Sequence, residues 1–188
     1  MQPQEPRRVC ILGAESTGKT TLAEALATRF GTVWNPEYGR IYTEVGRPPG
    51  AAWQSWEFAH IARVHCRYED FLAGLADRVL FCDTDAFTTA VFHEAYLGER
   101  ATGFDDLVVR LYDLYLVCDL DVPFQHDGWR EFEEQRRWMH ERLLQRAQES
   151  GSPWLLVGGD EETRLAAAAD AVEKLLVRPT GPPDATRS

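Results

Sequence analysis

The sequence predicts an α/β domain built on a mainly parallel, five-stranded sheet that is flanked by helices. Short apolar runs alternate five times with segments in which apolar residues recur at helical spacing. Such alternation is typical of folds whose right-handed crossovers bring the carboxyl ends of the strands to one edge of the sheet. The chain has 188 residues, of which 44% are hydrophobic, and this is enough to bury a single core.

Five short apolar runs bounded by glycine or polar residues mark the strands. We expect them at residues 7–12, 32–35, 79–82, 114–118 and 154–157. Runs of this length are typical of strands that are buried on both faces of a parallel sheet. The carboxyl ends of these strands are therefore where we look for a ligand site.

Helices are predicted for the segments that follow the strands. Residues 1–178 are expected to form one domain, and the tail 179–188, rich in Pro, Gly, Ser, Thr and Asp, is expected to be disordered. Gly31 and Gly98 stand where two of the helical patterns end. The predicted helices are 21–30, 53–76, 87–97, 131–149 and 161–177, with a shorter one at 107–112.

Charge and cysteine content limit the classes of function. Lys and Arg number 20 and Asp and Glu number 30, which gives a net charge of −10 and disfavours nucleic acid as the main partner. No apolar run approaches the ~20 residues that cross a bilayer, and the first residues lack a secretory signal pattern, so we expect no membrane association. The four cysteines form no CxxC pair, which favours reduced thiols and a cytoplasmic location.

A phosphate-binding loop is the most specific motif in the chain. Residues 13–20 have the sequence GAESTGKT and match GxxxxGK[ST], between a predicted strand and a predicted helix. In this motif, backbone N–H groups converge on phosphate oxygens, the lysine reaches the β- and γ-phosphates, and the final hydroxyl group binds Mg²⁺. The residues expected to bind ATP are Gly13, Glu15, Ser16, Thr17, Gly18, Lys19, Thr20 and Thr21.

Carboxylates follow two of the predicted strands and are candidates for acid–base or metal chemistry. Asp83, at the end of the third strand, is expected to hold Mg²⁺ or to accept the proton of an attacking hydroxyl group. Asp85 has two alternatives, a role in the site or the capping of the next helix. Glu37 follows the second strand and is a candidate general base or ribose-hydroxyl acceptor. Since acidic residues are also common at helix starts, a purely structural role for Glu37 remains open.

Three further residue types, Tyr, Arg and Trp, are candidates around these carboxylates. Tyr38 is a candidate for packing on an aromatic ligand, and Arg40 for holding Glu37 or meeting a phosphate. Among six tryptophans, Trp56 is assigned to substrate binding, with Trp53 and Trp129 as neighbouring candidates near loops. The five histidines show no metal-ligand spacing, so no metal site of their own is expected.

Arginines between the fourth strand and the long charged helix predict a lid at about residues 124–137. Arg130 and Arg136 are spaced to face one side of a flap that closes over a triphosphate. Guanidinium groups placed there neutralise charge on a transferring phosphoryl group. The alternative is that arginines among glutamates form solvated pairs along a helix, which applies most to Arg137.

Several segments together resemble the ribosylnicotinamide kinase domain of NadR-type proteins, over most of the chain. The DTD-x-x-TT block at 83–89 and the pair of blocks D-x-D-V-P and DG-x-R at 119–130 are more particular than the phosphate loop, which many families share. The segments that carry the resemblance are GAESTGKTTLAEALA, NPEYGR, WEFAHIARVHCRYEDFL, FCDTDAFTTAVF and YDLYLVCDLDVPFQHDGWR.

The resemblance implies a kinase that moves the γ-phosphate of ATP to the 5′-hydroxyl group of nicotinamide riboside. Lys19 and Thr20 would serve ATP and Mg²⁺, Arg130 and Arg136 would belong to the lid, and the segments around Glu37 and Asp83–Asp85 would border the riboside. It leaves open which carboxylate is the base. A kinase of another nucleoside or deoxynucleoside, and a non-catalytic ATP-binding regulator, are the alternatives. The adenylyltransferase and DNA-binding domains that NadR proteins often carry are not expected here.

Overall fold

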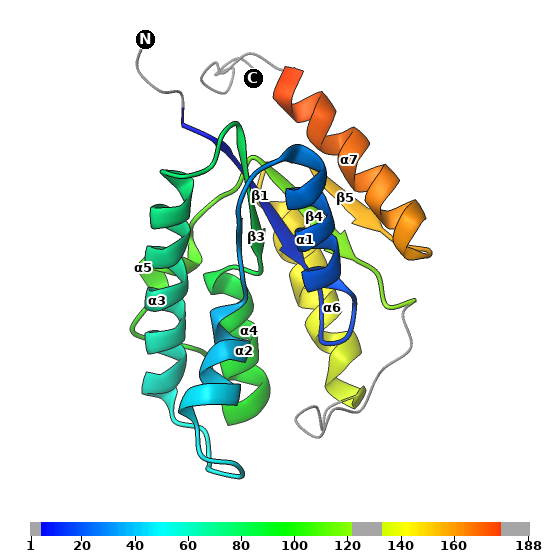
Figure 1. The fold of residues 1–188 in the computed structure, drawn as a ribbon. Helices are drawn as coiled ribbons and strands as arrows, with labels where there is room; N and C mark the ends of the chain where they lie inside the picture. Colours follow the sequence, from blue (N-terminus) through cyan, green and yellow to red (C-terminus); the bar gives the residue numbers. More distant parts are fainter. Residues whose placement is uncertain (1–4, 122–132, 178–188) are drawn as a thin grey trace, which may run out of the picture.

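Five parallel strands form the sheet that organises the chain (Figure 1). The computed structural model describes residues 5–121 and 133–177. The strand order β2-β3-β1-β4-β5 confirms the predicted fold class, with every described pair parallel. The strands are β1 (Arg7–Leu12), β2 (Trp34–Asn35), β3 (Val79–Asp83), β4 (Leu114–Cys118) and β5 (Trp154–Val157).

The central position of β1 determines where a ligand site can form. It pairs with β3 on one side and β4 on the other, and Ile11 stands opposite Asp83 in the register. The loops that follow β1 and β3 therefore lie side by side at the carboxyl edge of the sheet. This is the place where ligands bind in open parallel sheets.

Helices cover both faces of the sheet, and several differ from the predicted bounds. The α3 helix begins late, because Gln54 and Glu57 form a capping box at its start. The α5 helix lies earlier than predicted, with Asp105 and Asp106 in its first turn, where acidic groups favour the helix dipole. The helical elements are α1 (Lys19–Phe30), α2 (Tyr38–Ile41), the π-helix η1 (Tyr42–Gly46), α3 (Ser55–Ala73), α4 (Ala86–Leu97), α5 (Asp105–Val108), α6 (Glu133–Glu149) and α7 (Glu161–Val177).

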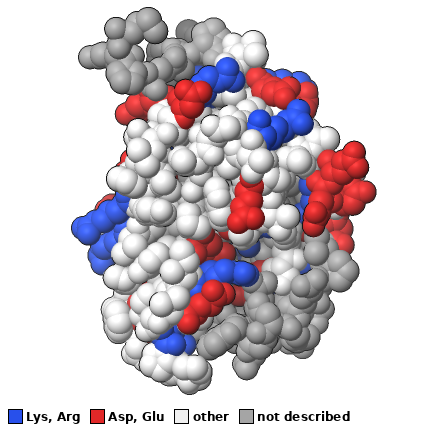
Figure 2. All heavy atoms as spheres, in the orientation of Figure 1, with Lys and Arg blue, Asp and Glu red and all other residues white. Residues whose placement is uncertain are grey.

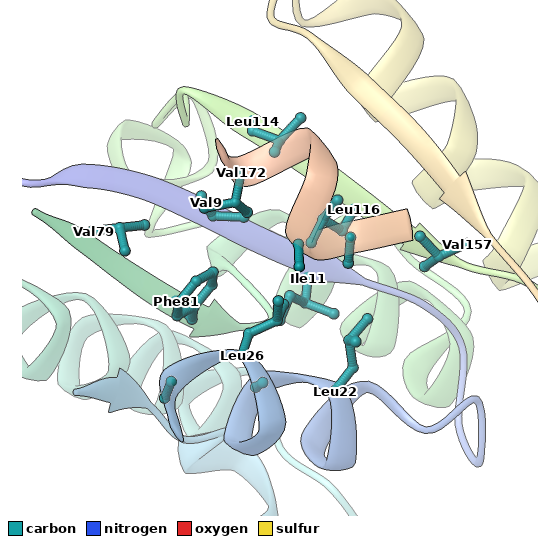
Figure 3. Packing of buried hydrophobic residues seen from close by; sticks show 14 of the residues in the cluster. Val9, Ile11, Leu22, Leu26, Val79, Phe81, Leu114, Leu116, Val157 and Val172 are labelled. Carbon is teal, nitrogen blue, oxygen red and sulfur yellow. The ribbon is translucent and has the colours of Figure 1, made fainter. Parts of the chain in front are cut away.

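Alternate residues of the strands belong to two apolar layers, one on each face of the sheet. On one face, Val9 and Ile11 of β1 pack with α1 and α7 (Figure 3). On the other face, Cys10 and Leu12 pack with α3, α4 and α6. All four cysteines are buried and unpaired. Because both faces of β1 are covered, its end is held rigidly, and so is the start of the loop that follows it.

The surface carries charges of both signs. On the face drawn in Figure 2, basic and acidic side chains are interspersed among uncharged ones, without a continuous basic patch. No helix among residues 5–121 and 133–177 is long and apolar enough to cross a bilayer. The predicted lid up to residue 132, which includes Trp129 and Arg130, and the predicted disordered tail lie outside the described residues.

Candidate active site at the carboxyl edge of the sheet

The loop between β1 and α1 forms a concave cradle of backbone amides. A Cβ atom on Gly13 would lie 2.5 Å from Thr17 Oγ1 and 3.1 Å from Cys118 Cβ, so the close approach of the chain requires glycine there. Ser16 and Gly18 have φ values of 54° and 80°, in the left-handed region. Alternation of left- and right-handed residues turns successive N–H groups toward one point, which is the geometry of an anion nest.

Lys19 and Thr20 occupy the first turn of α1, directly after the cradle. Lys19 is only 6% exposed, and its Nζ donates to the carbonyl oxygen of Ala14 over 3.0 Å. Thr20 Oγ1 donates to Asp83 Oδ2 over 2.6 Å. This bond joins the phosphate-binding loop, residues 13–20 (the P-loop), to the end of β3. Lys19 and Thr20, which are both predicted to bind ATP, therefore lie close to the carboxylate of Asp83.

Asp83 is buried with half of its carboxylate unused. Its Oδ1 has no hydrogen-bond partner among the described residues, although the side chain is fully buried. Burial, and after it the neighbouring Glu37, raise the pKa of Asp83 to about 6, although Lys19 and the Thr20 hydrogen bond oppose the shift. A buried carboxylate and an alcohol at this edge are the ligand set that Mg²⁺ uses in P-loop proteins, so the residues fit that ion.

Asp85, which the sequence left between two roles, caps α4. Its Oδ1 accepts hydrogen bonds from the backbone N–H and the hydroxyl group of Thr88, each over 2.8 Å. The cavity beside the P-loop is not lined by Asp85. The structure thus favours the capping role over the predicted catalytic and substrate-binding roles, because the carboxylate satisfies orphan donors at the helix start.

The turn that separates the two aspartates is strained. Thr84 has a φ of 74°, which is unusual for a β-branched residue. Its N–H donates to the carbonyl oxygen of Ile11 over 3.1 Å, and its own carbonyl oxygen lies 3.3 Å from His65 Nε2. Burial lowers the pKa of His65, so this ring is neutral at pH 7. The turn directs Asp83 toward Thr20 and Asp85 toward α4.

A cavity opens next to the P-loop, between α2, η1, α3 and α4. Four of the predicted site residues line it, namely Glu15, Lys19, Glu37 and Arg40. Glu37 precedes α2 without capping it through its side chain, so this carboxylate is not committed to the helix start. The cavity therefore brings Glu37 and Arg40 together beside the P-loop.

Of the six residues predicted to bind substrate, only Glu37 and Arg40 line this cavity; Tyr38, Trp56, Asp83 and Asp85 do not. The Tyr38 hydroxyl group lies 3.4 Å from His60 Nε2, in a ring cluster with Tyr42. Trp56 is 63% exposed, whereas Trp53, three residues earlier, lines the cavity. The structure therefore favours Trp53 over Trp56, which lies exposed in the first turn of α3.

Arg47 is a cavity residue that the sequence gave no reason to select. It follows η1 and is 9% exposed, and its Nε donates to Glu57 Oε1 over 3.1 Å. Its Nη2 donates to the carbonyl oxygen of Ala51, and its guanidinium carbon lies 3.8 Å from the ring centroid of Trp53. The only visible signal was the RPPG loop, which indicated a turn and nothing about chemistry.

Aromatic side chains continue the cavity wall beyond Trp53. The Trp53 ring lies 4.9 Å from Phe58 and 5.6 Å from Tyr96, measured between centroids. The Tyr96 hydroxyl group donates to Glu15 Oε1 over 3.5 Å, which links this wall to the P-loop. The cavity thus joins an acidic and cationic end to an aromatic one.

Two arginines contact the outer side of the P-loop. Arg136 of α6 donates to the carbonyl oxygens of Glu15 and Ser16, over 2.9 and 3.3 Å. Arg164 of α7 donates to the carbonyl oxygen of Thr17 over 2.7 Å. Arg136 was predicted to face the triphosphate from a lid, and in this structure it binds the loop backbone. Arg164 was not predicted, because nothing local marks an arginine in the last helix.

A protein-family model described as an AAA domain matches residues 8–164. The chain belongs to this family, AAA_28. The trifunctional NAD biosynthesis/regulator protein NadR of Escherichia coli (strain K12) is 29% identical over 182 residues, 94% of this chain and 44% of that protein. NadR of Salmonella typhimurium is 35% identical over 69% of this chain and 32% of its own length. This AAA_28 domain spans less than half the length of these curated relatives.

Solved structures place the AAA_28 domain among kinase-like folds. A NadR protein in complex with NR has a TM-score of 0.74 at 26% identity, over 91% of this chain and 52% of that one. Thymidylate kinase from Candida albicans has a TM-score of 0.64 at 14% identity, over 90% and 92% of the two chains, which shows the fold alone. The chain is therefore a P-loop protein of kinase-like fold that is related to NadR.

Proposed function

We propose that this domain is an ATP-dependent kinase that phosphorylates the 5′-hydroxyl group of nicotinamide riboside and yields nicotinamide mononucleotide. The observation that carries the proposal is the contact between Thr20 and the buried Asp83, beside a cavity that Lys19, Glu37 and aromatic side chains line. The similarity to NadR, including a NadR structure in complex with NR, supports the choice of acceptor. In this proposal the P-loop forms the donor side of the site, and the cavity forms the acceptor side.

On the donor side, the P-loop amides and Lys19 would bind the phosphates of ATP. Thr20 and Asp83 would hold Mg²⁺, which neutralises charge between the phosphates. Asp83 Oδ2 already lies within hydrogen-bond distance of the Thr20 hydroxyl group, and Oδ1 remains available. The Lys19 Nζ only needs to leave the Ala14 carbonyl oxygen to reach an incoming phosphate.

On the acceptor side, we assign Glu37 as the carboxylate that binds and orients the 5′-hydroxyl group. Asp83 is engaged with Thr20, whereas Glu37 lines the cavity without a capping bond. A carboxylate that accepts the hydroxyl proton raises the nucleophilicity of that oxygen as it attacks the γ-phosphorus atom. Arg40, which lines the same end, would counter the charge that the transfer brings into the cavity.

The aromatic wall suits a flat ring that carries positive charge. The faces of Trp53 and Tyr96 attract cations, and Arg47 already lies over the Trp53 ring. The carboxylates of Glu15 and Glu37 line the same cavity and can pair with a positively charged ligand. Nicotinamide riboside carries its charge on the pyridinium ring, in contrast to the neutral bases of common nucleosides. Arg47 uses Nε and Nη2 within the protein, which leaves Nη1 to donate to a carboxamide oxygen.

A substrate panel tests the proposal. ADP release should be stimulated by nicotinamide riboside with a kcat/KM well above that for adenosine, deoxyadenosine or thymidine, and mass spectrometry should identify nicotinamide mononucleotide. Glu37→Gln should lower kcat for every acceptor that reacts. Stimulation by another nucleoside instead would defeat the substrate assignment and retain the kinase. Absence of transfer to every acceptor, with ATP bound, would favour a nucleotide-binding regulator.

A further inference from the structure

Three consecutive carbonyl oxygens of the P-loop are bound by arginine side chains from outside the loop. The carbonyl oxygens of Glu15 and Ser16 accept from Arg136, and that of Thr17 accepts from Arg164. The two arginines come from α6 and α7, which pack on opposite faces of the sheet (Figure 1). Two distant elements therefore converge on one short stretch of backbone.

These contacts orient the amide groups that would face phosphate. Each peptide unit has its C=O and N–H groups on opposite sides, so a carbonyl oxygen held outward turns the next residue's N–H group inward. The three bound carbonyl oxygens belong to the peptide units whose N–H groups are those of Ser16, Thr17 and Gly18. Within the described chain, the N–H groups of Thr17 and Gly18 donate to no protein acceptor. They are the donors that an anion nest requires.

The guanidinium groups also strengthen these donors. A charge-assisted hydrogen bond to a carbonyl oxygen polarises its peptide unit, which makes the N–H group at the other end a better donor. The same contacts hold Ser16 in the left-handed conformation, which a serine adopts at an energetic cost when unsupported. The nest is thus supported both in its shape and in its charge.

Arg164 is itself held firmly, as a positioning residue must be. It is 4% exposed, its Nε donates to the carbonyl oxygen of Gly159 over 2.9 Å, and it forms an ion pair with Asp121. The turn before α7 and the segment that follows β4 therefore fix the guanidinium group against the loop. A lysine could make one of these contacts but has no planar fork with which to make them together.

We propose that Arg136 and Arg164 are positioning residues that hold the P-loop in its phosphate-binding shape by binding the carbonyl oxygens of residues 15–17. The inference rests on the proposed binding of ATP by this loop and is independent of which acceptor the kinase uses. It predicts that loss of either arginine weakens the binding of triphosphate while the binding of the acceptor is preserved.

Affinity for triphosphates tests this proposal without any acceptor. The variants are Arg164→Gln, Arg164→Lys and Arg136→Lys, and titration calorimetry would measure the Kd of a non-hydrolysable ATP analogue with Mg²⁺ and of inorganic tripolyphosphate. We expect each Kd to rise roughly 10- to 100-fold, the range for lost charge-assisted contacts. Tripolyphosphate carries no base or ribose, so its loss of binding is assigned to the loop.

Arg146 provides a matched control. It lies on α6 and its Nη2 donates to the carbonyl oxygens of Val108 and Arg110, over 3.0 and 2.9 Å, away from the P-loop. Arg146→Lys should leave both Kd values unchanged, whatever its effect on thermal stability. For an active acceptor, the loop variants should raise KM for ATP and leave KM for the acceptor unchanged.

Two outcomes would overturn the proposal. One is wild-type affinity for tripolyphosphate in folded Arg164→Lys and Arg136→Lys proteins. The other is an equal loss of affinity in Arg146→Lys, which would indicate a general effect of weakening the fold. If the wild-type protein bound tripolyphosphate but transferred phosphate to no acceptor, the proposed kinase function would fail while this inference stood.

Discussion

Replacement of Asp83 by Asn should stabilise the free protein while it removes the metal-binding carboxylate. The pKa of Asp83 is raised from 3.8 to about 6 in the folded state, mainly by burial and then by Glu37. Ionisation of Asp83 therefore opposes folding above pH 6. The folded and unfolded pKa values of Asp83 differ by about 2, and each unit changes the free energy of unfolding by ~1.4 kcal/mol. The whole effect is therefore ~3 kcal/mol at most. Asn keeps an oxygen that can accept from Thr20, so little of this gain is lost.

The sign and the pH window of the effect follow from linkage. Between about pH 4 and pH 6 the folded state binds more protons at Asp83 than the unfolded state, so this group makes stability fall as pH rises. The Asp83→Asn variant has no carboxyl group at this position and therefore lacks this pH-dependent loss of stability. Its advantage should be about 2 to 3 kcal/mol at pH 8, should shrink through pH 6, and should vanish near pH 4.

Urea unfolding followed by tryptophan fluorescence at pH 4, 6 and 8, with EDTA present, measures this advantage directly. Asp170→Asn is the control, because Asp170 is exposed and paired with Lys174, and no comparable pH-dependent gain is expected there. Addition of Mg²⁺ and ATP should stabilise the wild-type protein and should stabilise Asp83→Asn much less. A variant no more stable than wild type at pH 8, or equally favoured at pH 4, would refute the reasoning.

Three further changes test other parts of the site. Gly13→Ala should destabilise the fold by ~1 to 3 kcal/mol and weaken ATP binding, because the new Cβ atom would lie 2.5 Å from Thr17 Oγ1; wild-type denaturation and titration curves would contradict this. Arg47→Lys should raise KM for the riboside roughly 10-fold with little change in kcat, since a single ammonium group cannot keep the contacts of Nε and Nη2 and also supply the donor at Nη1. Trp56→Ser should leave KM unchanged; an equal rise in both would show that the cavity is misassigned. Asp85→Ala should lose ~1 to 2 kcal/mol of stability, and Asp85→Asn should retain both stability and activity because it still caps α4; loss of turnover in Asp85→Asn would restore a catalytic role for this carboxylate.

Local patterns in the sequence were sufficient for the fold class and for the donor half of the site. The alternation of apolar runs and helical periods predicted all five strands. The signal is strongest for β1, β3 and β4, which lie in the middle of the sheet, are buried on both faces and are therefore apolar along most of their length. The P-loop could be found because its shape depends on glycines and a lysine at fixed spacing within eight residues, 13–20. The position of Asp83 followed from the rule that parallel strands end at one edge.

Side-chain direction on helices could not be obtained in the same way. Trp53 and Trp56 lie close together in the sequence, yet only Trp53 lines the cavity, because the start of α3 at Ser55 determines which residues face inward. The capping box of Gln54 and Glu57 sets that start. The predicted helix began at Trp53, whereas Trp53 lies before α3, so its direction does not follow the helical period.

By itself, the sequence determined the parallel sheet, the phosphate loop and the carboxylate at the end of β3, since each depends on neighbours in the chain. Only the tertiary structure decided that Arg136 and Arg164 meet at the loop and that Arg47 joins Glu57 at the cavity wall. The physical reason is that these contacts join separate elements. Their geometry depends on how whole helices pack against the sheet, which no short window of sequence contains.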